Sequence, residues 1–345
     1  MTARQPSPTA PQKKSPAGGR GAALGERLLD PVVMGTICGL LSAVGYTLAN
    51  VCLRAATGID PTWVSFLKSV PTIVLVAPWL AILAGRGETL LPSWRMLGLI
   101  AVAGAFGQLA GNVAFQWSLG IVGIALAVPL TLGTIILSGA ILGRVFLRES
   151  VTLRMVGSIV ILICAIFVLS TGAKAAYESI TQAAGEGLLL LLAGVGAALL
   201  SGVAYATLGV AIRYGVTAGM SQPTTLMTVA LVGVVMLGAL AARRIGVEGM
   251  LATTPLDLSI MLGAGVFNAI AFIALTKALH LIPIVYVNAL NATQATMAAV
   301  CGVLIFQEAL SESLLFGVLL TIAGLILMRG KKRQPNDPQA EIGDD

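Results

Sequence analysis

Polar side chains recur at regular intervals inside stretches of the chain that are otherwise apolar. The interval is four residues in one stretch and three in another, and either spacing places its members along one face of a helix. The two sets are Gln108, Asn112 and Gln116, and Asn288, Asn291 and Gln294. A polar side chain that faces lipid is costly, so we expect these faces to line a wet cavity or to bond to other helices. Amide groups around a cavity can hydrogen-bond a small polar molecule.

The elements that must position these side chains are membrane-spanning helices. Of the 345 residues, 57% are hydrophobic and 10% are charged, against about 25% charged in ordinary soluble domains. This composition argues against a water-soluble enzyme, a nucleic-acid-binding domain and a disordered chain. Apolar runs of the length that crosses a bilayer predict ten spans between two tails, residues 1–30 and 331–345. The predicted spans are 33–53, 62–84, 96–117, 121–143, 153–171, 188–212, 223–242, 258–276, 283–306 and 313–328.

The chain also repeats itself at an offset of 159 or 160 residues. Residues 40–46 (LLSAVGY) recur as residues 199–205 (LLSGVAY), and Arg54 corresponds to Arg213. Each copy contains five spans, and because five is odd, the second copy enters the membrane from the opposite side. The sequence therefore predicts an all-α integral membrane protein whose ten transmembrane helices form two inverted five-helix repeats.

Lys and Arg fall mainly on one side of the predicted membrane. With the N-terminus inside, most of them lie in the two tails and in the loops after the second and fourth spans. Since positively charged segments stay on the cytoplasmic side, we expect a multi-pass protein of the cell (inner) membrane with both termini cytoplasmic.

The repeat links further polar residues inside the spans. Gln108 corresponds to Asn268, and Thr131 to Asn291. We interpret these residues as the wall of a pocket between the halves, where transporters built from inverted repeats place their substrate. For any single residue, interhelical hydrogen bonding is the alternative. The predicted substrate-binding residues are Tyr46, Asn50, Lys68, Gln108, Asn112, Thr131, Tyr205, Asn268, Asn288, Asn291 and Gln294.

Charged residues within the spans restrict the substrate. No Asp or Glu lies in the middle of a predicted span. A carrier of cations would be expected to keep such a carboxylate as a counter-charge, so cationic drugs are disfavoured. Lys68 is the one charge embedded in a span, and two interpretations remain open. Its side chain either extends to the interface or faces the cavity and meets a carboxylate.

The two halves share a second pattern around their third to fifth spans. In the first half it comprises residues 114–120 (AFQWSLG), a long span with Pro129, then Leu147, Arg148, Glu149 and Gly157; in the second, residues 274–280 (ALTKALH), the span from Pro283, then Phe306, Gln307, Glu308 and Gly317. On these residues, nearly all of 33–330 resembles the ten-span EamA-type members of the drug/metabolite transporter superfamily. The resemblance implies repeats at 31–172 and 187–330, each with an acidic residue that caps the following helix.

The resemblance also implies a function. We expect a secondary transporter that moves a small neutral or zwitterionic, amino-acid-like metabolite, with export as the direction. The alternatives are a nucleotide-sugar or lipid-linked sugar carrier of the same superfamily, and a non-transporting membrane scaffold. The sequence shows no enzyme motif, and its cysteines have no metal-ligand spacing, so we expect neither an enzyme, a cofactor nor a metal site. The expected partners are the substrate and the lipid bilayer, not nucleic acid, and a homodimer is left open.

Overall fold

The computed structural model describes residues 30–87, 90, 92–122, 124–149, 152–165, 167–168, 188–306 and 312–328. Every regular element in these ranges is a helix, and helices occupy all ten predicted span positions. The elements are α2 (Pro31–Ala55), α3 (Pro61–Gly85), α4 (Trp94–Phe106), η1 (Gly107–Val113), α5 (Ala114–Val122), α6 (Ile124–Phe146), α8 (Leu188–Thr217), α9 (Gln222–Leu251), α10 (Pro255–Leu281), α11 (Ile284–Asn291), α12 (Thr293–Phe306) and α13 (Glu312–Met328). A further apolar helix, Leu153–Ala165, lies between α6 and α8.

Several of these helices begin at a proline that follows a capping side chain. Asp30 accepts a hydrogen bond from Val32 N at 2.9 Å at the start of α2. Asp60 does the same for Thr62 N at 2.9 Å at the start of α3, and Thr254 for Asp257 N at 3.1 Å at the start of α10. Proline at the first helical position loses no helical hydrogen bond, and the cap satisfies one of the free N–H groups. The sequence therefore fixes where these spans begin.

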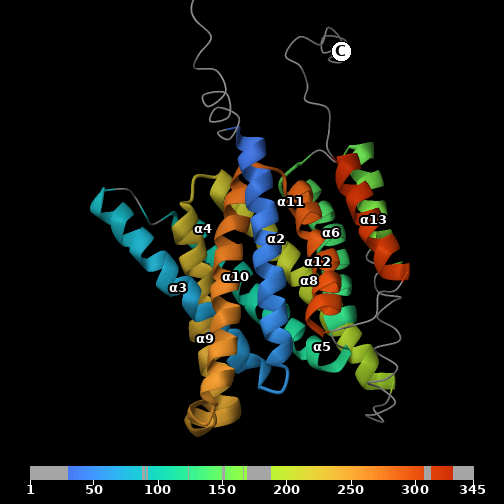
Figure 1. The fold of residues 1–345 in the computed structure, drawn as a ribbon. Coiled ribbons are helices and arrows are strands. Elements are labelled where there is room, and N and C mark those ends of the chain that lie inside the picture. Colours follow the sequence, from blue (N-terminus) through green and yellow to red (C-terminus); the bar gives the residue numbers. More distant parts are fainter. Residues whose placement is uncertain are drawn as a thin grey trace, which may run out of the picture.

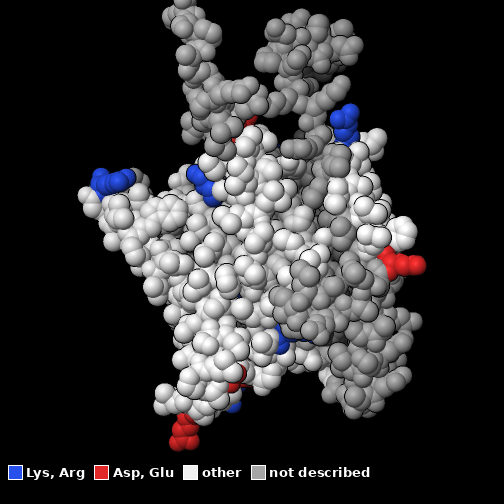
Figure 2. Space-filling view, viewed as in Figure 1, with Lys and Arg blue, Asp and Glu red and all other residues white. Residues whose placement is uncertain are grey.

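The outer surface of the bundle is apolar. Six helices of the described chain are long and apolar enough to cross a membrane: α2, α3, the continuous segment Trp94–Val122, Leu192–Thr217, α9 and α10. Valines near the middle of such helices are exposed, among them Val102 and Val235, both at 71%. Figure 2 shows a largely uncharged face whose Lys, Arg, Asp and Glu side chains gather toward the upper and lower ends. The protein is therefore a multi-pass membrane protein.

Equivalent helices of the two repeats run in opposite directions. In Figure 1, α2 descends through the bundle whereas its counterpart α8 ascends, and α3 ascends whereas α9 descends. The beginning of α2 and the end of α13 lie at the same end of the bundle, the upper end in Figure 1. This arrangement confirms the predicted fold of two inverted repeats.

The core lies where the two repeats meet. The most extensive helix contacts join α2 to α10, α6 to α8, and α3 to α9, and each of these pairs takes one helix from each repeat. Fully buried side chains of the core include Val64, Ile100, Leu226 and Met261. Residues of both repeats therefore surround any space left at the centre.

Two spans depart from a straight α-helix. The third span continues from α4 through η1, a π-helical segment, into α5. The ninth is interrupted at Ala292, between α11 and α12. Their repeat counterparts, α10 and α6, each run as one unbroken α-helix. Both departures occur beside the polar side chains that the sequence singles out.

Candidate functional site

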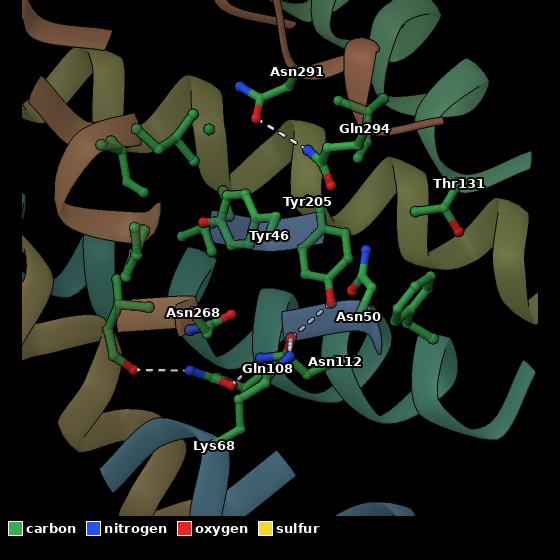
Figure 3. Close-up of a pocket in the computed structure, with 18 of the residues that line it drawn as sticks. Tyr46, Asn50, Lys68, Gln108, Asn112, Thr131, Tyr205, Asn268, Asn291 and Gln294 are labelled. Carbon is green, nitrogen blue, oxygen red and sulfur yellow. Dashed lines mark hydrogen bonds between the residues drawn. The ribbon is translucent and has the colours of Figure 1, made fainter. Parts of the chain in front are cut away.

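A cavity of about 160 Å³ lies at the centre of the bundle, between the repeats. All of the predicted substrate-binding residues line it: Tyr46, Asn50, Lys68, Gln108, Asn112, Thr131, Tyr205, Asn268, Asn288, Asn291 and Gln294. Figure 3 shows ten of them, labelled, around this space. The repeat relation and the helical spacing therefore identified residues up to 248 positions apart that meet around one cavity. That these residues contact a substrate stays a prediction.

Lys68 faces this cavity and does not extend to the membrane interface. The residue is only 4% exposed, and its Nζ donates a hydrogen bond to Asn112 Oδ1 at 2.5 Å. A lysine that reached the interface would leave its ammonium group exposed. The structure thus resolves the two interpretations of Lys68 in favour of the cavity, although its partner here is an amide.

Lys68 stands at one end of a chain of amide hydrogen bonds, which we call the lysine network (Lys68, Asn112, Gln108 and Tyr205). Asn112 Nδ2 donates to Gln108 Oε1 at 2.5 Å, and Gln108 Nε2 donates to the backbone oxygen of Val229 at 3.2 Å. Tyr205 O–H donates to Asn112 Oδ1 at 2.6 Å. Figure 3 shows these bonds below the two tyrosine rings. Because the Val229 oxygen can only accept, the direction of every bond is set, and Asn112 presents its oxygen to Lys68.

The π-helical segment η1 carries both amides of this network. A π-helix places more residues in each turn than an α-helix, and such segments often occur at functional sites. Two glycines let η1 lie directly against α8: a Cβ atom on Gly111 would stand 2.8 Å from Tyr205 Cε1, and one on Gly107 would stand 2.7 Å from Leu208 Cδ2. These glycines therefore allow the close approach that brings the Tyr205 hydroxyl to Asn112.

Gln116 does not join the stripe that its spacing suggests. Its Nε2 donates to the backbone oxygen of Leu53 at 3.3 Å, and the residue is buried outside the cavity. Gln116 lies beyond η1, on α5, and its side chain turns toward Leu53 of α2 instead of the cavity.

The opposite wall is formed by the second polar stripe, which we call the amide stripe (Asn288, Asn291 and Gln294). Asn291 Oδ1 accepts from Gln294 Nε2 at 3.0 Å and from Ser42 Oγ at 3.2 Å, and its Nδ2 donates to Val287 O at 3.1 Å. Asn288 Nδ2 donates to Ile135 O at 3.4 Å. The amide stripe thus lies on both sides of the interruption at Ala292. Its hydrogen bonds join this part of the ninth span to α2 and α6.

Three of the predicted site residues form no hydrogen bond with any described residue: Tyr46, Asn50 and Asn268. Thr131 differs, because its hydroxyl donates to Ala198 O at 3.1 Å. The unbonded amides offer both donors and acceptors. These three residues are thus the part of the wall that is free to bond a guest molecule.

The structure adds lining residues that sequence reasoning missed. Ser69 and Thr72 lie close to Lys68 in the sequence of α3 and also line the cavity. Thr72 is four positions after Lys68, and this spacing could have indicated that both residues share one face of the helix. Phe115 and Phe272 supply aromatic surface, and the Phe115 ring lies edge-on to Tyr205 with centroids 6.5 Å apart. An apolar residue in an apolar helix carries no comparable signal, because its lipid-facing neighbours look the same.

Two ion pairs join the repeats at opposite ends of the bundle. At the end that holds the C-termini of α8 and α10, Arg213 Nε meets Glu149 Oε1 at 2.9 Å, and Arg213 also donates to the backbone oxygen of Leu279. At the other end, Arg244 Nε meets Asp60 Oδ2 at 3.1 Å. Leu279 itself lines the cavity, so the first pair lies next to one of the residues of the cavity wall.

Glu149 does not cap the helix that follows it, as the family pattern implied. Its carboxylate instead accepts from Ile284 N at 3.1 Å, at the start of α11 in the second repeat. The pairing with Arg213 draws Glu149 across the interface between the repeats. The matching expectation for Glu308 lies outside the described residues.

Comparisons with known proteins agree with this architecture. A solved crystal structure has a similar fold, with a TM-score of 0.67 and 16% identity over 85% of this chain and 95% of that chain. No curated protein sequence matches the chain. The model of the EamA-like transporter family matches twice, at residues 33–171 and 192–330. Because these two matches cover most of the chain, one in each repeat, the protein belongs to the EamA-like transporter family.

Proposed function

We propose that the protein is a secondary transporter of a small neutral or zwitterionic metabolite of amino-acid type. The observation that carries this proposal is the cavity between the two inverted repeats, whose largely apolar wall contains polar side chains from both repeats. Transporters of this architecture bind their substrate at the interface of the repeats, near the middle of the membrane. The cavity has that position and a wall of amide, hydroxyl and aromatic groups.

The size of the cavity supports a small substrate. A water-sized group needs about 10–15 Å³ of such space, so a cavity of about 160 Å³ accommodates on the order of ten non-hydrogen atoms. Amino acids are of this size. Nucleotide sugars and lipid-linked sugars are several times larger, so the cavity disfavours the other carriers of the superfamily.

The charge of the cavity supports a neutral or zwitterionic substrate over a cationic one. Among the described residues that line the cavity, Lys68 is the one charged group, and none of them is a carboxylate. A cation would meet a like charge in a poorly solvated space, which is strongly unfavourable. The carboxylate of a zwitterion can pair with Lys68, and the molecule as a whole adds no net charge to the cavity.

Alternating access is the mechanism we propose. Each ion pair between the repeats lies at one end of the bundle, so rocking one repeat against the other can break one pair while the other holds. The Glu149–Arg213 pair lies on the side where most Lys and Arg residues fall, which is the cytoplasmic side by the positive-inside rule. We place both termini on that side, in the inner membrane, and propose export as the direction.

Transport by the purified protein in liposomes tests this proposal. The assay measures uptake of each proteinogenic L-amino acid by wild type and by Gln108→Leu, which removes the link from Asn112 to Val229 O. Gln116→Leu is the matched control, because Gln116 is a buried amide of the same span outside the cavity. We expect uptake of at least one amino acid, a loss of about tenfold or more in Gln108→Leu, and wild-type uptake in the control. Equal uptake by all three proteins would contradict the proposed site.

A further inference from the structure

Lys68 is a buried cation without an ionic partner in the described part of the chain. The ion pairs recorded there are Glu149–Arg213 and Asp60–Arg244, both at the ends of the bundle, and no described carboxylate lies within 4.0 Å of Lys68 Nζ. An ammonium group carries three N–H donors. One of them is used on Asn112, so two remain for another acceptor.

The lysine network holds this ammonium group in place without neutralising it. Asn112 Oδ1 accepts from both Lys68 and Tyr205, and the bond from Asn112 Nδ2 to Gln108 keeps that oxygen turned toward them. An amide oxygen carries only a partial charge. No described residue therefore supplies a counter-charge to the ammonium group that the network positions in the cavity.

We propose that Lys68 is the receptor for a carboxylate group of the transported metabolite, with Asn112 and Gln108 as positioning residues. The inference rests on the proposed transport function and specifies how its substrate is recognised. A single ammonium matches the single charge of a carboxylate. Phosphate groups carry more charge and are usually held by several donors, often by the planar fork of arginine, and no arginine is among the described residues that line the cavity.

The remaining wall fits the amino end of the same molecule. Asn50 and Asn268 have amide oxygens without a hydrogen-bond partner among the described residues, and the Tyr46 ring borders the same space. Amide oxygens accept hydrogen bonds from an ammonium group, and an aromatic face attracts a cation. A substrate with a carboxylate at one end and an amine at the other therefore has a partner for each group.

The test compares each proteinogenic L-amino acid with its carboxamide, which keeps the amine and side chain but has no negative charge. Ligand-induced thermal shifts and liposome uptake are measured for wild type, Lys68→Met and Lys277→Met. Lys277 is exposed and lies outside the cavity, so it controls for the loss of a lysine. For at least one amino acid, we expect wild type and the control to bind the acid about 10- to 100-fold more tightly than the carboxamide.

In Lys68→Met this preference should disappear, because affinity for the acid falls while affinity for the carboxamide stays. The variant should fold, since methionine fills similar space without a buried charge, and its melting temperature without ligand should equal or exceed that of wild type.

A second variant, Asn112→Asp, supplies an internal carboxylate at the position of the amide that Lys68 contacts. We expect it to lower affinity for the amino acid to the level of Lys68→Met, because the new carboxylate takes the place of the substrate's. Aspartate has nearly the same size as asparagine, so packing effects do not enter the comparison of Asn112→Asp with wild type.

A Lys68→Met protein that still prefers the acid over the carboxamide by the wild-type ratio would overturn the proposal and leave the transport function intact. Wild-type protein that neither binds nor transports any of the amino acids or carboxamides would overturn both.

Discussion

The two repeats share one sequence pattern but form unlike walls of the cavity. The third span of the first repeat contains the π-helical η1 and carries Gln108 and Asn112, whereas its counterpart α10 is a regular helix that carries Asn268 alone. The fourth span of the first repeat, α6, is unbroken, whereas its counterpart is divided at Ala292 and carries the amide stripe. In each repeat, one stripe of amide side chains therefore lies where its span departs from regular α geometry.

The hydrogen bonds of the two walls indicate different tasks. In the lysine network, the ammonium group of Lys68 retains N–H donors that no described residue accepts. In the amide stripe, the side chains bond to one another, to Ser42 and to backbone oxygens of α6 and α11. We infer that the first wall recognises the substrate and that the second stabilises the broken span. The variants below test this division, from the largest expected effect to the smallest.

Asn112→Leu should have the largest effect, because it breaks the lysine network at its centre. The buried ammonium of Lys68, the hydroxyl of Tyr205 and the Oε1 atom of Gln108 each lose their hydrogen bond to Asn112. A buried charge deprived of its hydrogen bond costs about 3 kcal/mol. Thermal unfolding in detergent should show that loss, and liposome uptake should fall below detection. An Asn112→Leu protein with wild-type uptake would show that the network does not serve recognition.

Asn291→Leu should mainly lower stability. It removes the acceptor for Ser42 and Gln294, both buried, at a cost of about 1–2 kcal/mol. Because the amide stripe is assigned a structural role, the preference for an amino acid over its carboxamide should stay at the wild-type ratio. Measuring that ratio beside the melting temperature separates the two roles, and a lost preference with unchanged stability would reverse the assignment.

Gly111→Ala should disturb the contact between η1 and α8. The new Cβ would stand 2.8 Å from Tyr205 Cε1, which forces the ring to move and weakens the bond from Tyr205 to Asn112. Overpacking of this kind costs about 1 kcal/mol or more after the better helix propensity of alanine is counted. Gly98→Ala is the control, because a Cβ there meets nothing within 4 Å. Equal melting temperatures for the two variants would contradict the close packing of η1.

Asp60→Asn should have the smallest effect. Asp60 pairs with Arg244 at the end of the bundle opposite the Glu149–Arg213 pair. Burial raises the pKa of Asp60, but hydrogen bonds from Thr62 and Trp63 and the nearby Arg244 outweigh it and hold the pKa below its ordinary value of 3.8. The carboxylate therefore stabilises the fold at pH values above 3.8, and this contribution is lost as the pH falls through the lowered pKa.

Asparagine caps a helix about as well as aspartate, and Arg244 is 57% exposed, so the variant should lose less than about 1 kcal/mol at neutral pH. Unfolding measured from pH 7 to pH 3 should show the difference from wild type shrinking below pH 3.8. A difference that grows on acidification would contradict the sign of this pKa shift.

The sequence predicted the membrane fold, the repeats and the membership of the cavity wall, because each depends on composition or on regular spacing. Apolar runs determine spans, and polar residues such as Gln108 and Asn291 must turn away from lipid. The repeat then indicates that such residues meet.

Other features depend on contacts that no spacing reveals. No regular spacing in the sequence predicts the π-helical geometry of η1 or the hydrogen bond from Gln116 to Leu53. Lys68 could have extended to the interface, and only the position of Asn112 decides its direction. Glu149 pairs with Arg213 of the other repeat, a long-range choice that a local capping pattern cannot predict.

The most direct test of the account measures whether the cavity opens to both sides of the membrane. Asn268→Cys, in protein whose own cysteines (Cys38, Cys52, Cys164 and Cys301) are replaced by serine, places one thiol in the unbonded part of the wall. The measurement is its reaction with a membrane-impermeant thiol reagent, added to one side at a time in vesicles of known orientation. We predict reaction from either side, slowed by the amino acid that the protein transports. Reaction from one side alone, or a rate that the amino acid does not change, would contradict alternating access to this cavity.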